Sequence, residues 1–422
     1  MVGAEGLSPT RVVVIGGAYG GAFTARALAE KLTPDQVHIT VIEAKGHFYC
    51  IPGTPRALVD KSFASNIWAP LDKLFNTARV NKKFPDAPSH QVVHGTVSEV
   101  HAKHVIVQET GEFYPYDYLV VATGIQFHKP LSTAFTSRDD GMAWENKYAE
   151  QVARAKKVLV VGGGPTGVEI AGEIKHAFSD TQVTLVHSSD QLLDDRLNAN
   201  FRQRLTERAR QVGIQLVLGD RVAIKPTDPT DPVALPETDS PLPMKTFVTE
   251  QGRTLEADWV IQTVGGKVNT SFMAPLLANA PAGVNWDTVV EPTSNALRVY
   301  PTLQLAHPDL TNILAVGDVN NFPCIKTAFR TMNQSKIAAK NLATLILNDR
   351  RDSPQDCTAL KLAPYVDNLN ALIVTLGPKA AVGLLPIMGG RVFGDWVCRL
   401  IKSSDAIAGS AWSSVGSKLL KT

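Results

Sequence analysis

Two short runs of glycine in this 422-residue chain have the spacing that lets a backbone hold a phosphate. The first run is Gly16-Gly17-Ala18-Tyr19-Gly20-Gly21, and the second is Gly162-Gly163-Gly164-Pro165-Thr166-Gly167. Glycines at these positions permit a tight turn and a close approach of backbone N–H groups to a pyrophosphate, which the dipole of a following helix attracts. Each run follows a β-branched stretch and precedes a helical pattern, so the sequence predicts two dinucleotide sites.

The two glycine runs belong to an internal repeat. Residues 11–28 (RVVVIGGAYGGAFTARAL) resemble residues 157–174 (KVLVVGGGPTGVEIAGEI), and the copies end in similar apolar phrases at 116–124 and 257–265. A strand, a glycine turn and a helix in this order build a parallel βαβ unit. We therefore predict an α/β fold with two Rossmann-like dinucleotide-binding domains.

The first copy has the features of an FAD site. Glu43 ends its second strand about 20 residues after the glycines, where an acid accepts hydrogen bonds from a ribose. The phrase TNILAVGD (311–318) places Asp318 after an apolar strand, where it can accept a hydrogen bond from a ribityl hydroxyl. The helix that follows is expected to direct its N-terminus at the flavin N1/C2=O edge. Lys326 lies close to that start, where we expect it to add a positive charge beside the negative charge that flavin reduction creates.

The second copy has the complete glycine set, but its second strand ends in His187-Ser188-Ser189 without an acid. An acid there would repel a 2′-phosphate, so both NADH and NADPH remain open as co-substrates. Glu169 falls in the first turn of the next helix. It is either stabilised there by the helix dipole alone or makes a polar contact near the nicotinamide.

These motifs divide the chain into domains. We predict a discontinuous FAD-binding domain at 10–128 and 290–350, an NAD(P)H-binding domain at 129–289, and a small α+β C-terminal domain at 356–422. The segment 127–148 is expected to be a loose connector. Six prolines between 225 and 243 predict a surface loop.

Composition argues against several classes of function. The chain has 42 Lys+Arg against 40 Asp+Glu, whereas a nucleic-acid-binding surface needs a basic excess, so we expect no nucleic-acid partner. The four cysteines show no CxxC pair or His–Cys cluster, so we expect no metal site. Cys50 stands alone in HFYCIPG, which excludes a disulfide reductase that needs a cysteine pair beside the flavin.

No secretory or membrane-spanning segment is expected. The longest apolar stretch, 371–390, contains Lys379, two prolines and four glycines, and a hairpin with strands at 372–376 and 381–385 explains it better than a spanning helix. Val2 follows Met1 where N-myristoylation needs glycine. We predict a cytoplasmic protein, with peripheral contact to a membrane or lipid droplet left open.

The C-terminal region carries an apolar set beside basic residues. The apolar members are Trp396, Val397, Leu400, Ile401 and Trp412, and the basic ones are Arg391, Arg399, Lys402, Lys418 and Lys421. One interpretation is an ordinary core with a solvated basic rim. The other is a dimer contact or a shallow dock on a membrane surface, so monomer and homodimer are both open.

The motifs IGGAYGG, VVATG, VVGGGPTGVEIAGEI, VTLVHS and AVGD, in this order, resemble the two-dinucleotide-binding flavoprotein oxidoreductases. Within them, the tail GRVFGDWVCRLIKSSDAIAGSAW resembles that of the apoptosis-inducing-factor-like (AIF-like) group, the branch that includes the ferroptosis suppressor proteins and their fungal relatives. The resemblance implies non-covalent FAD on the first copy and NAD(P)H on the second. It also implies hydride transfer to the flavin and then to a quinone-type acceptor.

Matching positions assign residues to these roles. The resemblance implies that FAD contacts Gly16, Gly17, Ala18, Gly20, Gly21, Glu43, Arg56, Thr123, Gly124 and Asp318. It implies that NAD(P)H contacts Gly162, Gly164, Gly167 and Glu169, with Lys326 and Glu169 as catalytic candidates. Two other functions use the same motifs: a flavin-dependent monooxygenase, and an NAD(P)H sensor with slow turnover that signals through partners.

Overall fold

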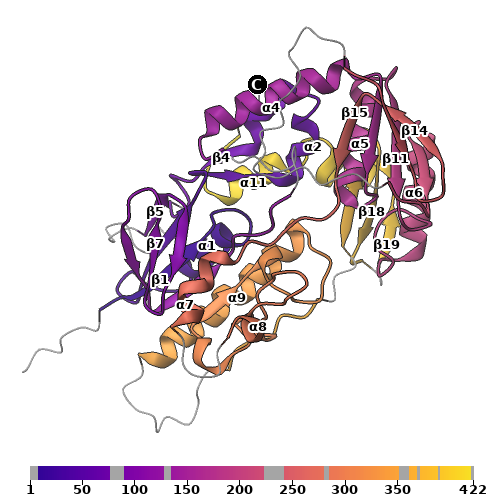
Figure 1. Cartoon of the computed structure of the whole chain (residues 1–422). Coiled ribbons are helices and arrows are strands. Elements are labelled where there is room, and N and C mark those ends of the chain that lie inside the picture. The colour runs from indigo at the N-terminus through magenta and orange to yellow at the C-terminus, as the bar shows by residue number, and fades with distance from the viewer. Residues whose placement is uncertain are drawn as a thin grey trace, which may run out of the picture.

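The computed structural model describes residues 8–76, 90–127, 135–222, 242–279, 285–350, 361–367, 371–387 and 390–419. Two parallel sheets lie in separate parts of the molecule, each flanked by helices, and the C-terminal strands lie beside the second sheet (Figure 1). The predicted α/β class with Rossmann-like units is confirmed. The predicted proline-rich loop lies almost wholly outside the described residues.

The first sheet has the strand order β16-β9-β1-β2-β5, and every pairing in it is parallel. Its strands are β1 (Thr10–Ile15), β2 (Val37–Glu43), β5 (Gln91–His94), β9 (Tyr118–Val121) and β16 (Ile313–Ala315). Parallel strands end at the same edge of a sheet, so the glycine run after β1, the acid that ends β2 and the GDV turn after β16 meet there. The chain therefore returns to the first sheet after the second copy.

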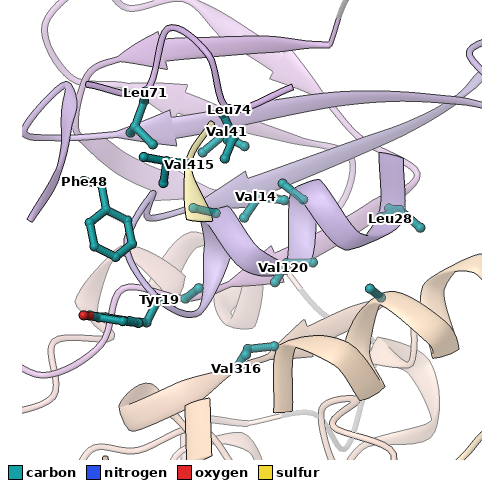
Figure 2. Close-up of a cluster of buried hydrophobic side chains, with 14 of the residues drawn as sticks. Val14, Tyr19, Leu28, Val41, Phe48, Leu71, Leu74, Val120, Val316 and Val415 are labelled. Carbon is teal, nitrogen blue, oxygen red and sulfur yellow. The ribbon is translucent and has the colours of Figure 1, made fainter. Parts of the chain in front are cut away.

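Two helices cover the first sheet and pack against each other. They are α1 (Gly21–Ala29) and α9 (Ala328–Asp349). The hydroxyl of Ser335 on α9 donates to the carbonyl of Gly20 at 3.0 Å, which joins α9 to the start of α1. Figure 2 shows the core between these layers, with Val14 and Val120 from neighbouring strands, Val316 beside α9 and Val415 from the C-terminal end. The C-terminal segment thus completes the core of the first domain.

The second sheet repeats this arrangement with the order β12-β11-β10-β15, again all parallel. Its strands are β10 (Lys157–Val161), β11 (Gln182–His187), β12 (Gln215–Leu218) and β15 (Trp259–Gln262). Helix α5 (Pro165–Ala177) follows the glycine run directly. The two copies of the sequence repeat therefore fold alike around their glycines.

Smaller elements complete the described structure. The strands are β3 (His47–Tyr49), β4 (Trp68–Pro70), β6 (Val97–Val100), β7 (His104–Val107), β8 (Phe113–Pro115), β13 (Lys245–Val248), β14 (Thr254–Ala257), β17 (Leu372–Thr375), β18 (Ala381–Leu385) and β19 (Arg391–Phe393). The helices are α2 (Thr54–Ala57), α4 (Arg138–Arg154), α6 (Ala199–Gln211), α7 (Ala274–Ala278), α8 (Trp286–Val289), α10 (Asp395–Cys398) and α11 (Ala408–Ser414). A π-helix, Arg399–Ser403, continues α10.

The interpretation of 127–148 as a loose connector is wrong for its second half, because α4 begins at Arg138. The Ser137 hydroxyl caps this helix by accepting from the Asp140 N–H at 3.2 Å, and two acids occupy the first turn. Tyr148 and Val152 bury one face of the helix in the core of the second domain. Helix α4 therefore stands between the two glycine-containing units as a packed element.

The predicted C-terminal hairpin is confirmed by the antiparallel pairing of β17 with β18. Its Val374 and Leu376 pack in the same core as Val168 and Ile174 of α5. Phe272 packs with the core under the first sheet, although it falls inside the predicted second domain. The exact domain boundaries stay a prediction. Within the described residues, no helix is long and apolar enough to cross a membrane.

Candidate functional site

The glycines of the first run are required by backbone contacts. Gly16 has φ +97°, and a Cβ there would lie 2.5 Å from the carbonyl oxygen of Ala122. A Cβ on Gly21 would lie 1.7 Å from the Gly16 oxygen, far inside van der Waals contact. A larger residue at either position would force the β1–α1 turn open. Glycine is therefore needed to keep the N–H groups of the turn at the start of α1.

Glu43 lies against this turn. Its carboxylate accepts hydrogen bonds from the Gly17 N–H and, at 2.9 Å, from the Lys45 N–H. Gly20 is buried, and a Cβ there would approach the Val316 oxygen at 3.1 Å. Ala18 is half-buried at the tip of the turn. The structure therefore gathers Gly16, Gly17, Ala18, Gly20, Gly21 and Glu43 at one edge of the first sheet.

Thr123 and Gly124 follow β9, the strand beside β1, and have free space around them. Thr123 is exposed, and Gly124 has φ +70° with no atom within 4 Å of an added Cβ. Both follow β9, which pairs directly with β1. The two residues thus lie beyond the strand next to the glycine turn, with space around them for a bound group.

Asp318 lies in the turn that follows β16. The turn is fixed by Gln334, whose Oε1 accepts the Gly317 N–H at 2.8 Å. Burial raises the pKa of the Asp318 carboxyl, while the charge of Lys326 acts in the opposite direction. The two residues that sequence analysis placed near a flavin therefore lie within electrostatic reach of each other.

Lys326 stands just before α9, with its ammonium folded back onto the chain. It donates to the carbonyl of Asn320 at 2.7 Å and to the Asn320 side-chain oxygen at 3.1 Å. Desolvation lowers the pKa of Lys326, against the opposing charges of Cys324, Asp318 and Glu291. These contacts hold the Lys326 side chain just before the N-terminal end of α9, and its predicted place beside a flavin stays a prediction.

The second glycine run has the same geometry. Gly162 has φ +118°, and a Cβ on Gly167 would lie 2.0 Å from the Gly162 oxygen. At Gly164, by contrast, an added Cβ would meet no atom within 4 Å. Because α5 starts at Pro165, this open position lies directly at the N-terminus of a long helix. The space in front of it suits an approaching phosphate.

His187 occupies in the second copy the position that Glu43 holds in the first. Its Nδ1 accepts the Gly163 N–H at 3.2 Å, as the Glu43 carboxylate accepts the Gly17 N–H. Burial lowers the pKa of His187, and the charges of Arg202 and Arg221 lower it further. The buried Nε2 has no hydrogen-bond partner among the described residues. At neutral pH the second turn therefore has an uncharged imidazole where the first turn has a carboxylate.

Arg56 and Glu169 lie together at a junction that the sequence did not reveal. The Arg56 guanidinium binds Glu173 of α5 at 2.8 Å and donates to the carbonyl oxygens of Ser403 and Ser404 at 2.7 and 2.9 Å. Glu169 lies one turn before Glu173 on the same helix, where it receives the ammonium of Lys402 at 2.6 Å. The contacts of Arg56 in this structure are thus with α5 and the C-terminal domain.

A buried acid on α4 was also missed by sequence analysis. Glu145 is fully buried and accepts from the Tyr49 hydroxyl at 2.8 Å and from the Trp68 indole N–H at 3.1 Å. Burial raises the pKa of Glu145 to about 7, although these two hydrogen bonds and the charge of Lys45 oppose the shift. The helix that contains it showed only a weak apolar pattern, so no local signal pointed to this residue.

The described cysteines form no disulfide. Cys50, Cys324 and Cys398 are free and buried. Burial raises the pKa of the Cys50 thiol to about 11, and its sulfur lies 3.3 Å from the Tyr19 hydroxyl oxygen. A buried thiol with a high pKa is a poor nucleophile at neutral pH. Cys50 therefore has the environment of a packed apolar residue.

Three large apolar side chains of the C-terminal domain are exposed. Trp396 is 75% exposed, Leu400 71% and Ile401 50%, so the interpretation of these three as core is wrong. Trp412 is different, because it is half-buried and its indole donates to the Asn66 carbonyl at 2.8 Å. The exposed side chains lie on α10 and the π-helix, and Arg399 between them is also exposed.

The two glycine turns fit dinucleotides. Each turn excludes a Cβ by backbone contact and precedes a helix that starts at its end, and Gly164 faces open space. The unpartnered Nε2 of His187 adds a polar atom beside the second turn. These features match the demands of a pyrophosphate and its ribose, so the residues present suit FAD at the first turn and NAD(P)H at the second.

The sequence of this chain is similar to those of known proteins. Residues 10–340 match the family model described as pyridine nucleotide-disulphide oxidoreductase. The chain is 28% identical over 406 residues to apoptosis-inducing factor homolog A of Dictyostelium discoideum, covering 94% of this chain and 90% of that protein. It is 27% identical to human ferroptosis suppressor protein 1, covering 96% and 95%. The resemblance seen in the motifs is thereby confirmed.

A solved structure has the same fold over almost the whole chain. The sulfide:quinone oxidoreductase of Aquifex aeolicus matches with a TM-score of 0.66 and 20% identity, covering 97% of this chain and 92% of that chain. At this identity the likeness concerns the fold. The fold therefore extends through the C-terminal domain as well as the two glycine-containing units.

Proposed function

Because this chain belongs to the pyridine nucleotide-disulphide oxidoreductase family, whose members use FAD and NAD(P)H, we propose that it is an NAD(P)H:quinone oxidoreductase. The observation that carries the proposal is the presence of two matched glycine turns in one chain. The first has an acid beside it and the second has a neutral histidine. This difference suits an FAD that stays bound and an NAD(P)H that exchanges.

The chain's own residues would hold and orient the two nucleotides. The N–H groups at Gly16–Gly21 and the Glu43 carboxylate would bind FAD, with Asp318 on its ribityl chain. Bound FAD supplies the hydride and electron chemistry. Lys326 would place positive charge where flavin reduction creates negative charge, and Glu169 would orient the nicotinamide. The turn from Gly162 to Gly167 would bind the pyrophosphate of NAD(P)H.

A quinone-type acceptor is supported by the resemblance to the AIF-like group and by two features of the chain. Among the described cysteines, none forms a disulfide and all are buried, so no dithiol is positioned there to relay electrons to a protein disulfide. The exposed surface of Trp396, Leu400 and Ile401 suits contact with a membrane, where a lipophilic acceptor resides. The exposed Arg399 beside it favours anionic lipid.

Anaerobic rapid mixing of the purified flavoprotein with NADH and, separately, NADPH tests the proposal. We expect fast loss of the flavin absorbance at about 450 nm, then fast return on addition of a ubiquinone analogue. A long-lived charge-transfer band that the quinone does not discharge would favour a sensor. Reoxidation by O₂ with hydroxylation of an added substrate would favour a monooxygenase. Either result would contradict the quinone assignment.

A further inference from the structure

A cavity of about 270 Å³ lies where the C-terminal end of α5 meets α6 and the hairpin of β17 and β18. Helix α5 contacts β17 and α6 contacts β18, and Figure 1 shows α5, α6 and β18 close together. The ionisable side chains that line the cavity are all basic: Lys175 and His176 of α5, Arg208 of α6 and Lys379 of the hairpin turn. Its described lining contains no acid, so the cavity has the charge of an anion site.

Backbone contacts between α5 and the hairpin set the walls of this cavity. A Cβ on Gly172 of α5 would lie 2.3 Å from the Cα of Leu376. A Cβ on Gly377 would lie 2.8 Å from the Cβ of His176, and Gly377 has φ +83°, which favours glycine. The hairpin turn therefore packs directly on the last turns of α5, and Lys379 lines the same cavity as His176.

Two of the four basic side chains are compensated by contacts that the structure shows. The Lys175 ammonium donates to the carbonyl oxygens of Ser179 and Thr181 at 2.6 and 3.1 Å. Arg208 binds Asp395 at 2.7 Å. A helix C-terminus carries a partial negative charge of about half an elementary charge, which is an ordinary reason for a lysine there. Lys175 and Arg208 alone would therefore indicate no ligand.

Lys379 and His176 lack such compensation. Within the part of the chain that the structure describes, neither the Lys379 ammonium nor the His176 ring forms a hydrogen bond or ion pair, and both side chains are exposed. Partial burial lowers the pKa of His176, and the charges of Lys379 and Arg56 lower it further. The cavity thus contains free hydrogen-bond donors and a positive charge that no described acid balances.

The cavity is small and lies far from the second glycine turn. Pockets for drug-sized ligands have volumes of about 300–1,000 Å³, so this one admits one or two phosphate groups rather than a whole dinucleotide. Lys175 and Pro165, at opposite ends of α5, are separated by about 15 Å at a rise of about 1.5 Å per residue. Cationic nitrogen donors form short, strong hydrogen bonds with phosphate oxygens.

We propose that this cavity binds a small phosphate-bearing anion, at a site separate from both glycine turns. Lys379 and His176 donate to the phosphate oxygens, and Lys175 and Arg208 add positive charge. A free phosphorylated metabolite and a phosphorylated lipid headgroup share this chemistry. The ligand contacts α5, α6 and the C-terminal hairpin at once, so its binding stabilises their packing. The inference does not depend on hydride transfer or on the electron acceptor.

The test uses inorganic pyrophosphate as the probe and calorimetry of the FAD-loaded protein as the assay. All variants carry Gly164→Leu, which blocks the second glycine turn as an alternative site. We expect one pyrophosphate to bind, and Lys379→Glu to raise its Kd about tenfold or more, because an attraction becomes a repulsion. Lys340→Glu, at an exposed lysine of α9, is the control with the same change of charge and should alter Kd less than about twofold.

A proton should be taken up when the anion binds. The positive charges that face His176 come from α5 (Lys175), α6 (Arg208), the hairpin (Lys379) and α2 (Arg56). They keep the ring neutral at pH 7, and a bound anion raises the pKa of the ring by offsetting them. Heats of binding in two buffers of different ionisation enthalpy measure this uptake, and His176→Gln should abolish it.

The proposal is overturned if pyrophosphate does not bind to Gly164→Leu, or if Lys379→Glu leaves the Kd within about twofold. Should the Lys379→Glu variant lose FAD, Lys379→Gln gives the same comparison without the added acid. Phosphatidylcholine vesicles with and without phosphatidylinositol 4-phosphate distinguish the two sources of phosphate. Sedimentation that requires this lipid and falls in Lys379→Glu assigns the cavity to a headgroup, whereas equal sedimentation of both proteins assigns it to a free anion.

Discussion

Replacing Arg56 with Met removes one partner of a buried ion pair and leaves the other in place. The Arg56 and Glu173 side chains are 8% and 3% exposed, and their contact is 2.8 Å long. Loss of one partner from such a pair costs about 3–5 kcal/mol, because the remaining charge is buried without compensation. The carbonyls of Ser403 and Ser404 also lose their donor, which places the expected loss at the upper end of this range.

The assay is urea unfolding of the FAD-loaded protein, followed by circular dichroism. Arg11→Met is the matched control, since Arg11 and Asp117 form a pair at 2.7 Å whose side chains are 47% and 39% exposed. Exposed pairs contribute about 0–1 kcal/mol. Arg56→Met/Glu173→Gln should recover most of the loss, because no buried carboxylate then lacks a partner.

The loss should also depend on pH with a defined sign. Burial raises the pKa of Glu173, and Arg56 opposes the shift, so the pKa rises further in Arg56→Met. An unfolded glutamate ionises near pH 4.3, and the folded variant keeps its proton above that pH. The stability of the variant therefore falls as pH rises from about 4.3 toward the folded pKa. A loss no larger than that of Arg11→Met, or one that persists in the double variant, would refute this reasoning.

Three further results are expected. His187→Glu should lower kcat/KM for NADPH by about tenfold or more while NADH changes little, because it restores an acid beside Gly163; equal loss with both nucleotides would contradict this. Burial raises the pKa of Glu145 to about 7, so the folded protein keeps a proton on this carboxyl that the unfolded chain releases. Relative to Glu145→Gln, the free energy of unfolding of the parent in urea should therefore fall by about 3 kcal/mol as pH rises from about 4.5 to 7. A difference between the two proteins that does not change with pH would contradict the burial argument. Trp396→Ser/Leu400→Ser should abolish sedimentation with anionic liposomes without changing FAD content, and unchanged sedimentation would exclude this surface as the membrane contact.

The repeat made the fold predictable from the sequence. A run of glycines between a β-branched strand and a helix is typical of a dinucleotide-binding βαβ unit. Two copies of this pattern, with equal strand patterns, indicate two parallel sheets. The return of β16 to the first sheet was implied by the AVGD phrase alone. Helix α4 was missed because its buried face rests on a few residues such as Tyr148 and Val152 within a polar segment.

The contacts of the site were less predictable than its elements. Lys402 and Glu169 are 233 positions apart, and no local pattern links them. The same holds for Glu145, whose partners Tyr49 and Trp68 belong to distant strands. The exposure of Trp396, Leu400 and Ile401 was ambiguous for a different reason. A tryptophan and two aliphatic residues at helical spacing can form part of a core or part of a surface. Only the packing of the C-terminal domain determines which one they form.

The most direct test of the two-site assignment compares equivalent positions in the two glycine turns. Ala18→Leu and Gly164→Leu each place a bulky side chain where a pyrophosphate must approach, and Gly164 has open space around it. We expect Ala18→Leu to lose FAD. Gly164→Leu should keep FAD that dithionite reduces but that NADH and NADPH do not. Loss of FAD in both variants, or reduction of Gly164→Leu by NADH at the parent rate, would contradict the assignment.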